Sequence, residues 1–276
     1  MSCHARNAVL IVDETGGGEI IGRLECEFAK PEGIAVNSKG SVFVVDRYHH
    51  CIHVFNSELK QQRCITSDFQ EPGRMNQPVG IAISSVDDSI WIADNENHRV
   101  LQFSADGRYV KTLGSGYGTA PGQMFCPCGI ALYNHPSYGE LVAVSEWGGG
   151  RVQVFFGGQH QGGVFSIYGG VQHAHHVVVD SSGTLYVTEY ATRKIKRFSL
   201  DGELVGGGEW AASAVSLVAA PNNNWGLDTV VLQKELVRPL LLLVDGSSGG
   251  GKNVVVGVGQ KKRRKEEEDH HHHQPQ

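Results

Sequence analysis

Three histidines stand almost side by side in the sequence, at His173, His175 and His176. Imidazole is the commonest metal ligand among side chains, so this group suggests a metal centre. A catalytic zinc takes about three protein ligands and keeps one position open for water or substrate. One short segment cannot surround an ion by itself. The metal hypothesis therefore depends on which other segments the fold brings close to these histidines.

A second group of side chains has the types found in binding surfaces. Aromatic and arginine side chains supply most of the energy in protein interfaces. The members of this group all lie just after an acidic residue that ends an apolar run, and they are Arg47, Tyr48, His49, Asn95, Glu96, His98, Trp147 and Tyr190. The same residue types are also common where repeated units pack against each other, so both interpretations remain open.

A repeat explains why the acids recur. The segment Pro31-Glu-Gly-Ile-Ala-Val36 returns as Pro78-Val-Gly-Ile-Ala-Ile83, as Pro127-Cys-Gly-Ile-Ala-Leu132 and, more weakly, as Ala174-His-His-Val-Val-Val179. The copies are spaced by 47 to 49 residues. A period in this range is typical of a solenoid or a propeller.

Each copy continues with the same succession of short apolar runs and polar turns. A second run ends on Asp46, Asp94, Glu146 or Glu189, and a third run begins about five residues later and ends on Phe55, Phe103, Phe155 or Phe198. A looser fourth run follows. Four short strands per copy predict one blade of a β-propeller, an all-β fold. We expect each acid to accept hydrogen bonds from backbone N–H groups across the next turn. We expect each phenylalanine to pack between blades.

The same acid pattern appears near both ends of the chain, at Asp13 and Asp245. Six acids favour six blades, although the degenerate stretch 205–240 leaves five open. Ring closure should combine strands from both termini, because open strand edges invite aggregation. The propeller is predicted to span residues 1–258, with the clearest repeats over 30–203, and residues 259–276 are predicted to be a disordered tail.

Alignment of the copies also tests the metal hypothesis. The positions that match His175 in the other copies are Glu32, Val79 and Cys128, so only Cys128 adds a plausible zinc ligand to His175. Two ligands hold zinc weakly. We therefore expect no metal and no other cofactor, and we expect the histidines to be surface-turn residues.

The repeat resembles the NHL family. The closest copy is the second one, where a strand ending Ala93-Asp94 is followed by Asn97-His98-Arg99-Val100. The resemblance implies a propeller that recognises a protein, or alternatively an RNA, in some cases as the target-recognition part of a ubiquitin ligase. A minority of the family are enzymes, of which the amidating lyase carries a histidine-bound zinc in its channel. A metal-dependent lyase or hydrolase is therefore the alternative function.

Composition narrows the remaining choices. The formal net charge of −5 argues mildly against a strong nucleic-acid binder. The six cysteines form no C-x-x-C pair, which disfavours a zinc ribbon or finger and indicates thiols in a reducing compartment. The longest apolar run is far shorter than a membrane span. A cytoplasmic protein without a membrane partner is the expectation.

Two low-complexity stretches complete the sequence. The glycine-rich segment from Gly246 to Lys252 resembles a phosphate-binding loop, but Asn253 replaces the usual serine or threonine and a strand pattern follows, so we expect no nucleotide. The basic run Lys261–Lys265 could direct nuclear import, and it precedes an acidic run and four histidines, His270 to His273. The histidines could bind metal weakly without any relation to function.

Overall fold

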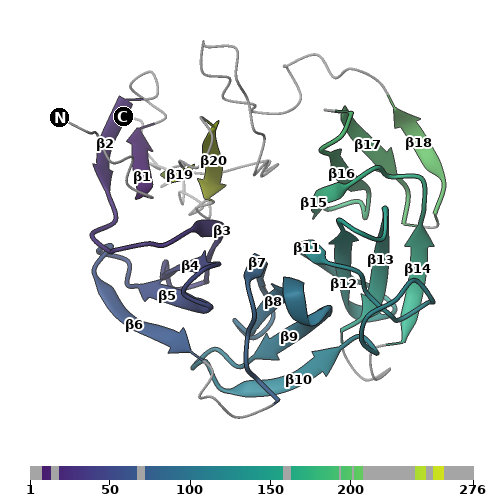
Figure 1. Cartoon of the computed structure of the whole chain (residues 1–276), viewed down its shortest axis with the longest axis horizontal. Coiled ribbons are helices and arrows are strands. Elements are labelled where there is room, and N and C mark those ends of the chain that lie inside the picture. The colour runs from purple at the N-terminus through teal and green to yellow at the C-terminus, as the bar shows by residue number, and fades with distance from the viewer. Residues whose placement is uncertain are drawn as a thin grey trace, which may run out of the picture.

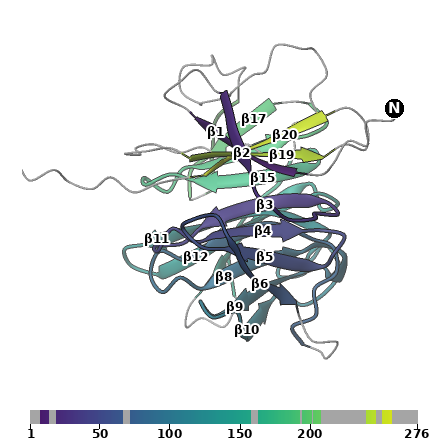
Figure 2. The same ribbon diagram turned by 90° about the vertical axis from the view of Figure 1, so that its left-hand side faces the viewer.

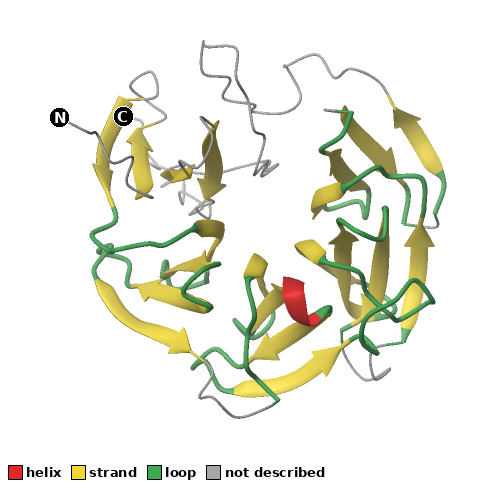
Figure 3. Cartoon of the chain, viewed as in Figure 1, coloured by secondary structure: helices red, strands yellow, loops and turns green. Residues whose placement is uncertain are grey.

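The computed structural model describes residues 8–13, 19–66, 72–157, 163–192, 194–200, 202–207, 240–246 and 251–257. This part of the chain is all-β, as predicted: it contains twenty strands and one helical turn, η1 (Asn95–Asn97), drawn in red in Figure 3. No helix within it is long and apolar enough to cross a membrane.

Each of the four clear sequence copies forms one four-stranded antiparallel sheet, with its strands paired in chain order. The sheets stand around a ring, with the first strand of each toward the centre and the fourth at the perimeter (Figure 1). The strands of the first two sheets are β3 (Pro31–Val36), β4 (Val42–Asp46), β5 (Cys51–Phe55) and β6 (Gln61–Thr66), then β7 (Pro78–Ile83), β8 (Ile90–Asp94), β9 (Arg99–Phe103) and β10 (Tyr109–Leu113). Those of the next two are β11 (Pro127–His135), β12 (Gly139–Glu146), β13 (Arg151–Phe156) and β14 (Val164–Tyr168), then β15 (Ala174–Val179), β16 (Leu185–Glu189), β17 (Lys194–Phe198) and β18 (Leu204–Gly207).

The fifth sheet joins the two ends of the chain. Its strand order is β2 (Glu19–Arg23), β1 (Ala8–Asp13), β19 (Leu240–Gly246) and β20 (Gly251–Gly257). Both views place it beside the β3–β6 sheet (Figures 1 and 2). The predicted pairing of the termini is therefore found. Because Asp13 and Asp245 lie in the same sheet, the terminal acids do not mark two separate blades.

The described residues thus form five sheets, whereas six acids had favoured six blades. The degenerate stretch lies mostly in residues 208–239, outside the described residues, so the count of six stays a prediction. The expected disordered tail and the basic run 261–265 also fall outside the described residues.

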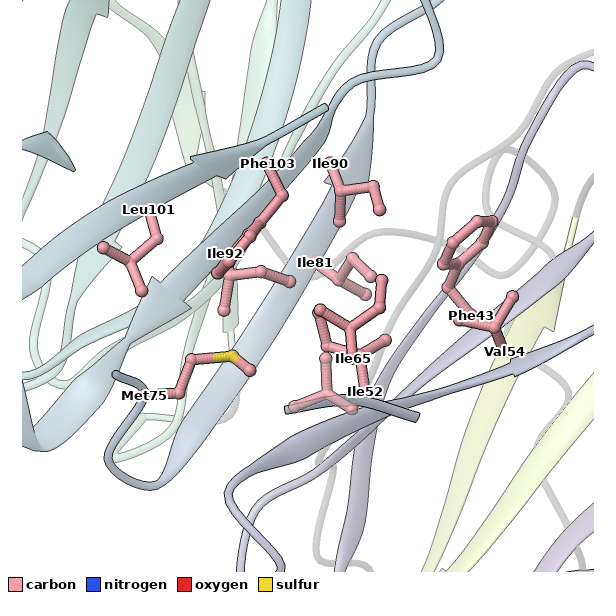
Figure 4. Close-up of a cluster of buried hydrophobic side chains, with 11 residues drawn as sticks. Phe43, Ile52, Val54, Ile65, Met75, Ile81, Ile90, Ile92, Leu101 and Phe103 are labelled. Carbon is pink, nitrogen blue, oxygen red and sulfur yellow. The ribbon is translucent and has the colours of Figure 1, made fainter. Parts of the chain in front are cut away.

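The sheets pack face to face through apolar side chains that alternate along each strand. Ile52 and Val54 of β5 point from one sheet, and Ile90 and Ile92 of β8 from the next, into a shared cluster of buried side chains (Figure 4). The four phenylalanines predicted at the ends of the third strands, Phe55, Phe103, Phe155 and Phe198, are at most 5% exposed, which confirms their predicted place between sheets, although β13 continues one residue further to Phe156. A blade buries its apolar faces only against its neighbours, so the ring is the unit of stability.

Glycine sets the spacing at the centre of the ring. A Cβ atom at Gly33 would lie 2.6 Å from the Val79 carbonyl oxygen, and one at Gly129 would lie 2.7 Å from that of His175. At Gly80 a Cβ would come closer still to the Cys128 carbonyl. Neighbouring inner strands therefore touch through their backbones, and any side chain at these positions would push two sheets apart.

Candidate functional site

One end of the ring carries the acids of the four clear copies, Asp46, Asp94, Glu146 and Glu189. In each antiparallel sheet the second strand ends where the first and third strands begin, so the loops around these points share one end. We call this end the acid face. It comprises the loops at residues 47–50, 95–98, 147–150 and 190–192 and the segments that enter the inner strands at residues 29–30, 74–77, 115–126 and 171–173.

The acids hold the acid face together. All four are buried, with at most 3% exposed. Each accepts hydrogen bonds from backbone N–H groups, as predicted, but the main donors lie before the inner strand rather than across the next turn. The donors are Ala29 and Lys30 for Asp46 (2.8 and 2.9 Å), Asn76 for Asp94 (2.6 Å), Phe125 for Glu146 (2.9 Å) and Gln172 for Glu189 (2.9 Å).

Three of these acids each pair with a cationic side chain from the third strand of their own sheet. The atoms that pair are Arg99 Nε with Asp94 (2.9 Å), Arg151 Nε with Glu146 (2.9 Å) and Lys196 Nζ with Glu189 (2.7 Å). Asp46 differs, since its oxygen Oδ2 lies 2.9 Å from His49 Nδ1 and 3.4 Å from His53 Nε2. Burial alone would raise the pKa of Asp46, but the hydrogen bonds from His53, Lys30 and Ala29 lower that pKa to about 2.

The histidine of the repeat motif connects neighbouring sheets. His98 has a left-handed backbone, and its Nδ1 accepts a hydrogen bond from the Cys126 N–H (3.2 Å), which leads into the next inner strand. His50 does the same in the preceding sheet, accepting from the Gln77 N–H (2.9 Å). The His98 ring also packs on Tyr117, with centroids 4.9 Å apart. His98 was predicted to contact a partner, and the structure gives its Nδ1 a partner within the protein.

Two more of the predicted binding residues are engaged between sheets. Asn95 is 4% exposed and donates a hydrogen bond from Nδ2 to the Pro127 carbonyl (2.9 Å). Arg47 is partly buried and donates from Nε to Gln77 Oε1 (3.1 Å). Neither side chain is freely presented on the surface.

The other predicted residues form the outer part of the acid face. Tyr48 and Tyr190 are 54% and 47% exposed, and His49 and Glu96 are also exposed. Trp147 is half-buried and contacts both Tyr190 (ring centroids 4.9 Å apart) and His173 (4.8 Å). Tyr117 is 61% exposed and was not among the predicted residues, because it lies in a long loop outside the repeat pattern.

The two weak metal candidates lie on adjacent inner strands. His175 Nδ1 is 2.7 Å from His176 Nδ1, and burial lowers the pKa of His176 well below 6.5. Cys128 lies within 3.4 Å of Asn95 Nδ2, and burial raises the pKa of its thiol to about 12. Neither His175 nor Cys128 belongs to a group of three close ligand atoms in the described part of the chain.

Two such groups do occur there, and both lie in the β3–β6 sheet. One is Asp46, His49 and His53, and the other is Cys51, His53 and Cys64. The Asp46 carboxylate already accepts two backbone N–H bonds, which makes the first group a poor cation site. The second group was missed because its residues come from two strands without a recognised spacing. The alternation Cys51-x-His53 on one strand was the available signal.

Comparison with known proteins identifies the repeat. The model of the family described as NHL repeat matches residues 28–55 and 75–103. The matching stretches contain β3–β5 and β7–β9, including Asp46 and Asp94.

Curated relatives are of two kinds. Rat peptidylglycine alpha-amidating monooxygenase is 25% identical over 54% of this chain and 16% of its own length. Protein brain tumor of Drosophila melanogaster is 36% identical over 54% of this chain and 14% of its own length. A probable peptidyl-alpha-hydroxyglycine alpha-amidating lyase of Caenorhabditis elegans is 24% identical over 69% of this chain and 55% of its own length. This chain therefore spans from about one-seventh to about half of these relatives.

Solved structures support the fold. The crystal structure of a nidogen/laminin complex aligns with a TM-score of 0.59 and 19% identity, covering 71% of this chain and 69% of that chain. A streptogramin B lyase structure aligns with a TM-score of 0.53 and 14% identity, covering 92% of this chain and 74% of that chain. At these identities the likeness concerns the fold alone. With its sheets arranged like propeller blades and its acids repeated at the motif positions, the chain contains NHL repeats at residues 28–55 and 75–103 and is distantly related to brain tumor and to the amidating-lyase propellers.

Proposed function

We propose that this protein is a non-catalytic recognition module that binds a protein partner on the acid face. The observation that carries the proposal is the set of three half-exposed tyrosines there, Tyr48, Tyr117 and Tyr190. Tyrosine offers a large rigid contact area with a polar end, and it is enriched among the residues that dominate binding energy.

The framework beneath these tyrosines is rigid, which favours binding. Tyr117 packs on His98, whose Nδ1 is bonded to the next sheet, and Tyr190 packs on Trp147. A side chain that is ordered before binding loses less conformational entropy when the partner arrives. The NHL repeats at residues 28–55 and 75–103 support recognition as the role, and target recognition in a ubiquitin-ligase system is the specific setting that we propose.

A matched set of variants tests the proposal. Tyr48→Ala and Tyr190→Ala remove side chains of the acid face, whereas Tyr138→Ala removes a tyrosine of similar exposure, 48%, from the β11–β12 hairpin at the other end of the sheets. Partners captured by proximity labelling in cells are quantified for each variant, and the affinity of each purified candidate is then measured. We expect a loss of at least about 10-fold for the acid-face variants, as for interface anchors, and none for Tyr138→Ala. Equal losses in all three variants, or none, would refute the acid face as the site.

RNA is the other macromolecular partner that the family resemblance implies. Fluorescence anisotropy with a pool of single-stranded RNA, measured over a range of salt concentrations, separates it from a protein partner. Sequence-independent RNA binding should fall steeply with salt because phosphate contacts release counterions. Tight RNA binding that Tyr48→Ala abolishes would replace the protein proposal.

An enzyme of the lyase or hydrolase type is the second candidate, favoured by the cluster of His175, His176 and Trp147 near the inner strands and by the amidating-lyase relatives. The residues present do not fit a catalytic zinc, which takes about three protein ligands. Only His175 and Cys128 are ligand-type residues at the matching position of the four copies, and the Cys128 thiol contacts Asn95. The assay is cleavage of a peptidyl-α-hydroxyglycine with zinc added. We expect no turnover above background, and turnover lost in His175→Ala would establish the enzyme instead.

A further inference from the structure

A cluster of three cysteines and one histidine lies at the third and fourth strands of the first sheet, away from the inner strands. Cys51 and His53 alternate on β5, so both side chains point to the same face of the sheet. Cys64 of β6 lies directly opposite His53 in the strand register. Cys26 comes from the segment between β2 and β3, which connects this sheet to the terminal sheet. The four residues thus converge from three parts of the chain.

The sulfur atoms of the three cysteines all lie close to the imidazole ring of His53, two of them near Nδ1 and one near Nε2. His53 Nδ1 lies 3.1 Å from Cys64 Sγ and 3.4 Å from Cys26 Sγ, and Cys51 Sγ lies 3.6 Å from the other ring nitrogen, Nε2. Ligand atoms of Cys51, His53 and Cys64 all fall within 4.8 Å of one another. Zinc bonds of about 2.3 Å to sulfur and 2.0 Å to nitrogen, set at a tetrahedral angle, separate the two atoms by about 3.5 Å.

The surroundings of His53 also suit a metal ligand. Its Nε2 lies 3.4 Å from Asp46 Oδ2, so a proton on Nε2 can be shared with that carboxylate and leave Nδ1 with a free lone pair. Histidines that bind metals almost always donate their second ring N–H to such an acceptor. The ring of Phe28 packs edge-on against the imidazole at 5.1 Å between centroids and fixes its orientation. Gln61 Nε2 lies 3.1 Å from Nδ1 and 3.5 Å from Cys64 Sγ, and this exposed side chain must turn aside when an ion enters.

The site is closed on one side and open on the other. Cys51 and His53 are buried, Cys26 is partly buried and Cys64 is exposed. An ion can therefore enter from the edge strand β6 without unfolding the sheet, and ions need such a path.

A disulfide between Cys51 and Cys64 is the competing interpretation, and the strand register disfavours it. Cys51 pairs with Thr66, and Cys64 pairs with His53, so the two cysteines are diagonal neighbours. Diagonal residues in antiparallel strands are about 7–8 Å apart. A disulfide requires Cα atoms within about 6.8 Å.

We propose that Cys26, Cys51, His53 and Cys64 form a structural zinc site that fastens the segment after β2 to the β5–β6 hairpin. Thiolates and one imidazole are the donor set of structural zinc, and they discriminate against magnesium and calcium, which prefer oxygen. On binding, each ligating thiol loses its proton to solvent. Because Cys26 lies between the terminal sheet and the first complete repeat, zinc there would stabilise the junction where the two chain ends meet.

The test uses the full chain with His270 to His273 changed to alanine, so that the terminal histidines contribute no metal binding. Cobalt(II) is added as a spectroscopic probe, and zinc content is measured after dialysis. We expect one ion per chain and an intense sulfur-to-cobalt charge-transfer band, which only thiolate ligands produce. Cys64→Ser should abolish the band and the bound zinc. Its matched control is Cys126→Ser, another accessible free cysteine outside the cluster, which should keep both.

Stability gives an independent readout. Zinc should raise the melting temperature of the parent chain and of Cys126→Ser, since a ligand that binds only the folded state stabilises it. Zinc should leave the melting temperature of Cys64→Ser unchanged. Zinc should slow backbone hydrogen exchange around Cys26 in the parent chain and in Cys126→Ser, but not in Cys64→Ser. Absence of the charge-transfer band in the parent chain, or its retention in Cys64→Ser, would overturn the proposal. A band that disappears in Cys126→Ser alone would place the metal elsewhere and overturn it equally.

Discussion

The β3–β6 and β7–β10 sheets come from adjacent copies of one repeat, and each buries an acid at the same position, Asp46 or Asp94. The side chains that contact this acid differ between the two sheets. Asp94 pairs with Arg99, the first residue of the third strand, whereas the register partner of Asp46 is Cys51. In the first sheet the contacts to the acid come from His49 and His53. The first sheet therefore has a thiol at the position where the second sheet has the arginine that pairs with the acid. The two sheets share the backbone hydrogen bonds to the acid, but the side chains around the acid differ.

The largest expected effect follows from removing the arginine of the second sheet. Arg99→Leu leaves the Asp94 carboxylate buried without its cation and should lower the free energy of unfolding by about 3–5 kcal/mol. Cys51→Ser, the same position in the first sheet, should cost about 1 kcal/mol or less in zinc-free buffer, since no ion pair is lost. Urea denaturation measures both. Equal losses would show that Arg99 contributes no more than an ordinary strand residue.

Next in size is the backbone contact at the ring centre. Gly80→Ala places a methyl group against the Cys128 carbonyl, and such overpacking should cost about 1–3 kcal/mol. Gly169→Ala is the matched control, because nothing lies within 4 Å of the added Cβ there. Thermal unfolding of the two variants checks the difference. A stable Gly80→Ala protein would mean that the inner strands can separate without cost.

A loss of stability of similar size is expected when the acid of the second sheet is removed, and an outer-turn residue of the same sheet serves as its control. Asp94→Ala removes an acceptor for the Asn76 N–H, for Asn97 and for Arg99, so it should destabilise the protein by about 1–3 kcal/mol. Ser104→Ala, whose hydroxyl bonds are exposed, should cost much less. Equal melting temperatures of the two variants would contradict the structural role of the acid.

The smallest expected effect is a pH dependence in the fourth sheet. Burial acts to raise the pKa of Glu189, but hydrogen bonds from Lys196, Thr192 and the Gln172 N–H lower it below 4.5. A lowered folded-state pKa means that Glu189 stabilises the fold at pH values above 4.5, and that this contribution is lost as the pH falls through the folded-state pKa. Glu189→Gln should therefore reduce the slope of stability against pH below 4.5. An unchanged slope would show that this carboxylate titrates as it does in the unfolded chain.

The sequence predicted what the repeat itself encodes. The strands, the buried acids and the terminal phenylalanines recur at fixed spacing, and each copy confirmed the others. Bonds between copies were harder to foresee. The link from His98 to the Cys126 N–H depends on a left-handed backbone and joins residues 28 positions apart, and the burial of Asn95 depends on the neighbouring sheet. The cysteine cluster depends on Cys26, which lies in a connection outside the repeat, so no periodicity could place it beside His53.

A double-mutant cycle tests most directly the claim that the two sheets hold the same acid by different chemistry. The free energies of unfolding are measured in zinc-free buffer for Asp94→Ala, Arg99→Leu and the double variant, and for Asp46→Ala, Cys51→Ser and their double variant. We predict a coupling energy of about 1–3 kcal/mol for Asp94 with Arg99, as for residues in direct contact, and a coupling below about 0.5 kcal/mol for Asp46 with Cys51. Coupling energies of equal size in the two sheets would contradict the account.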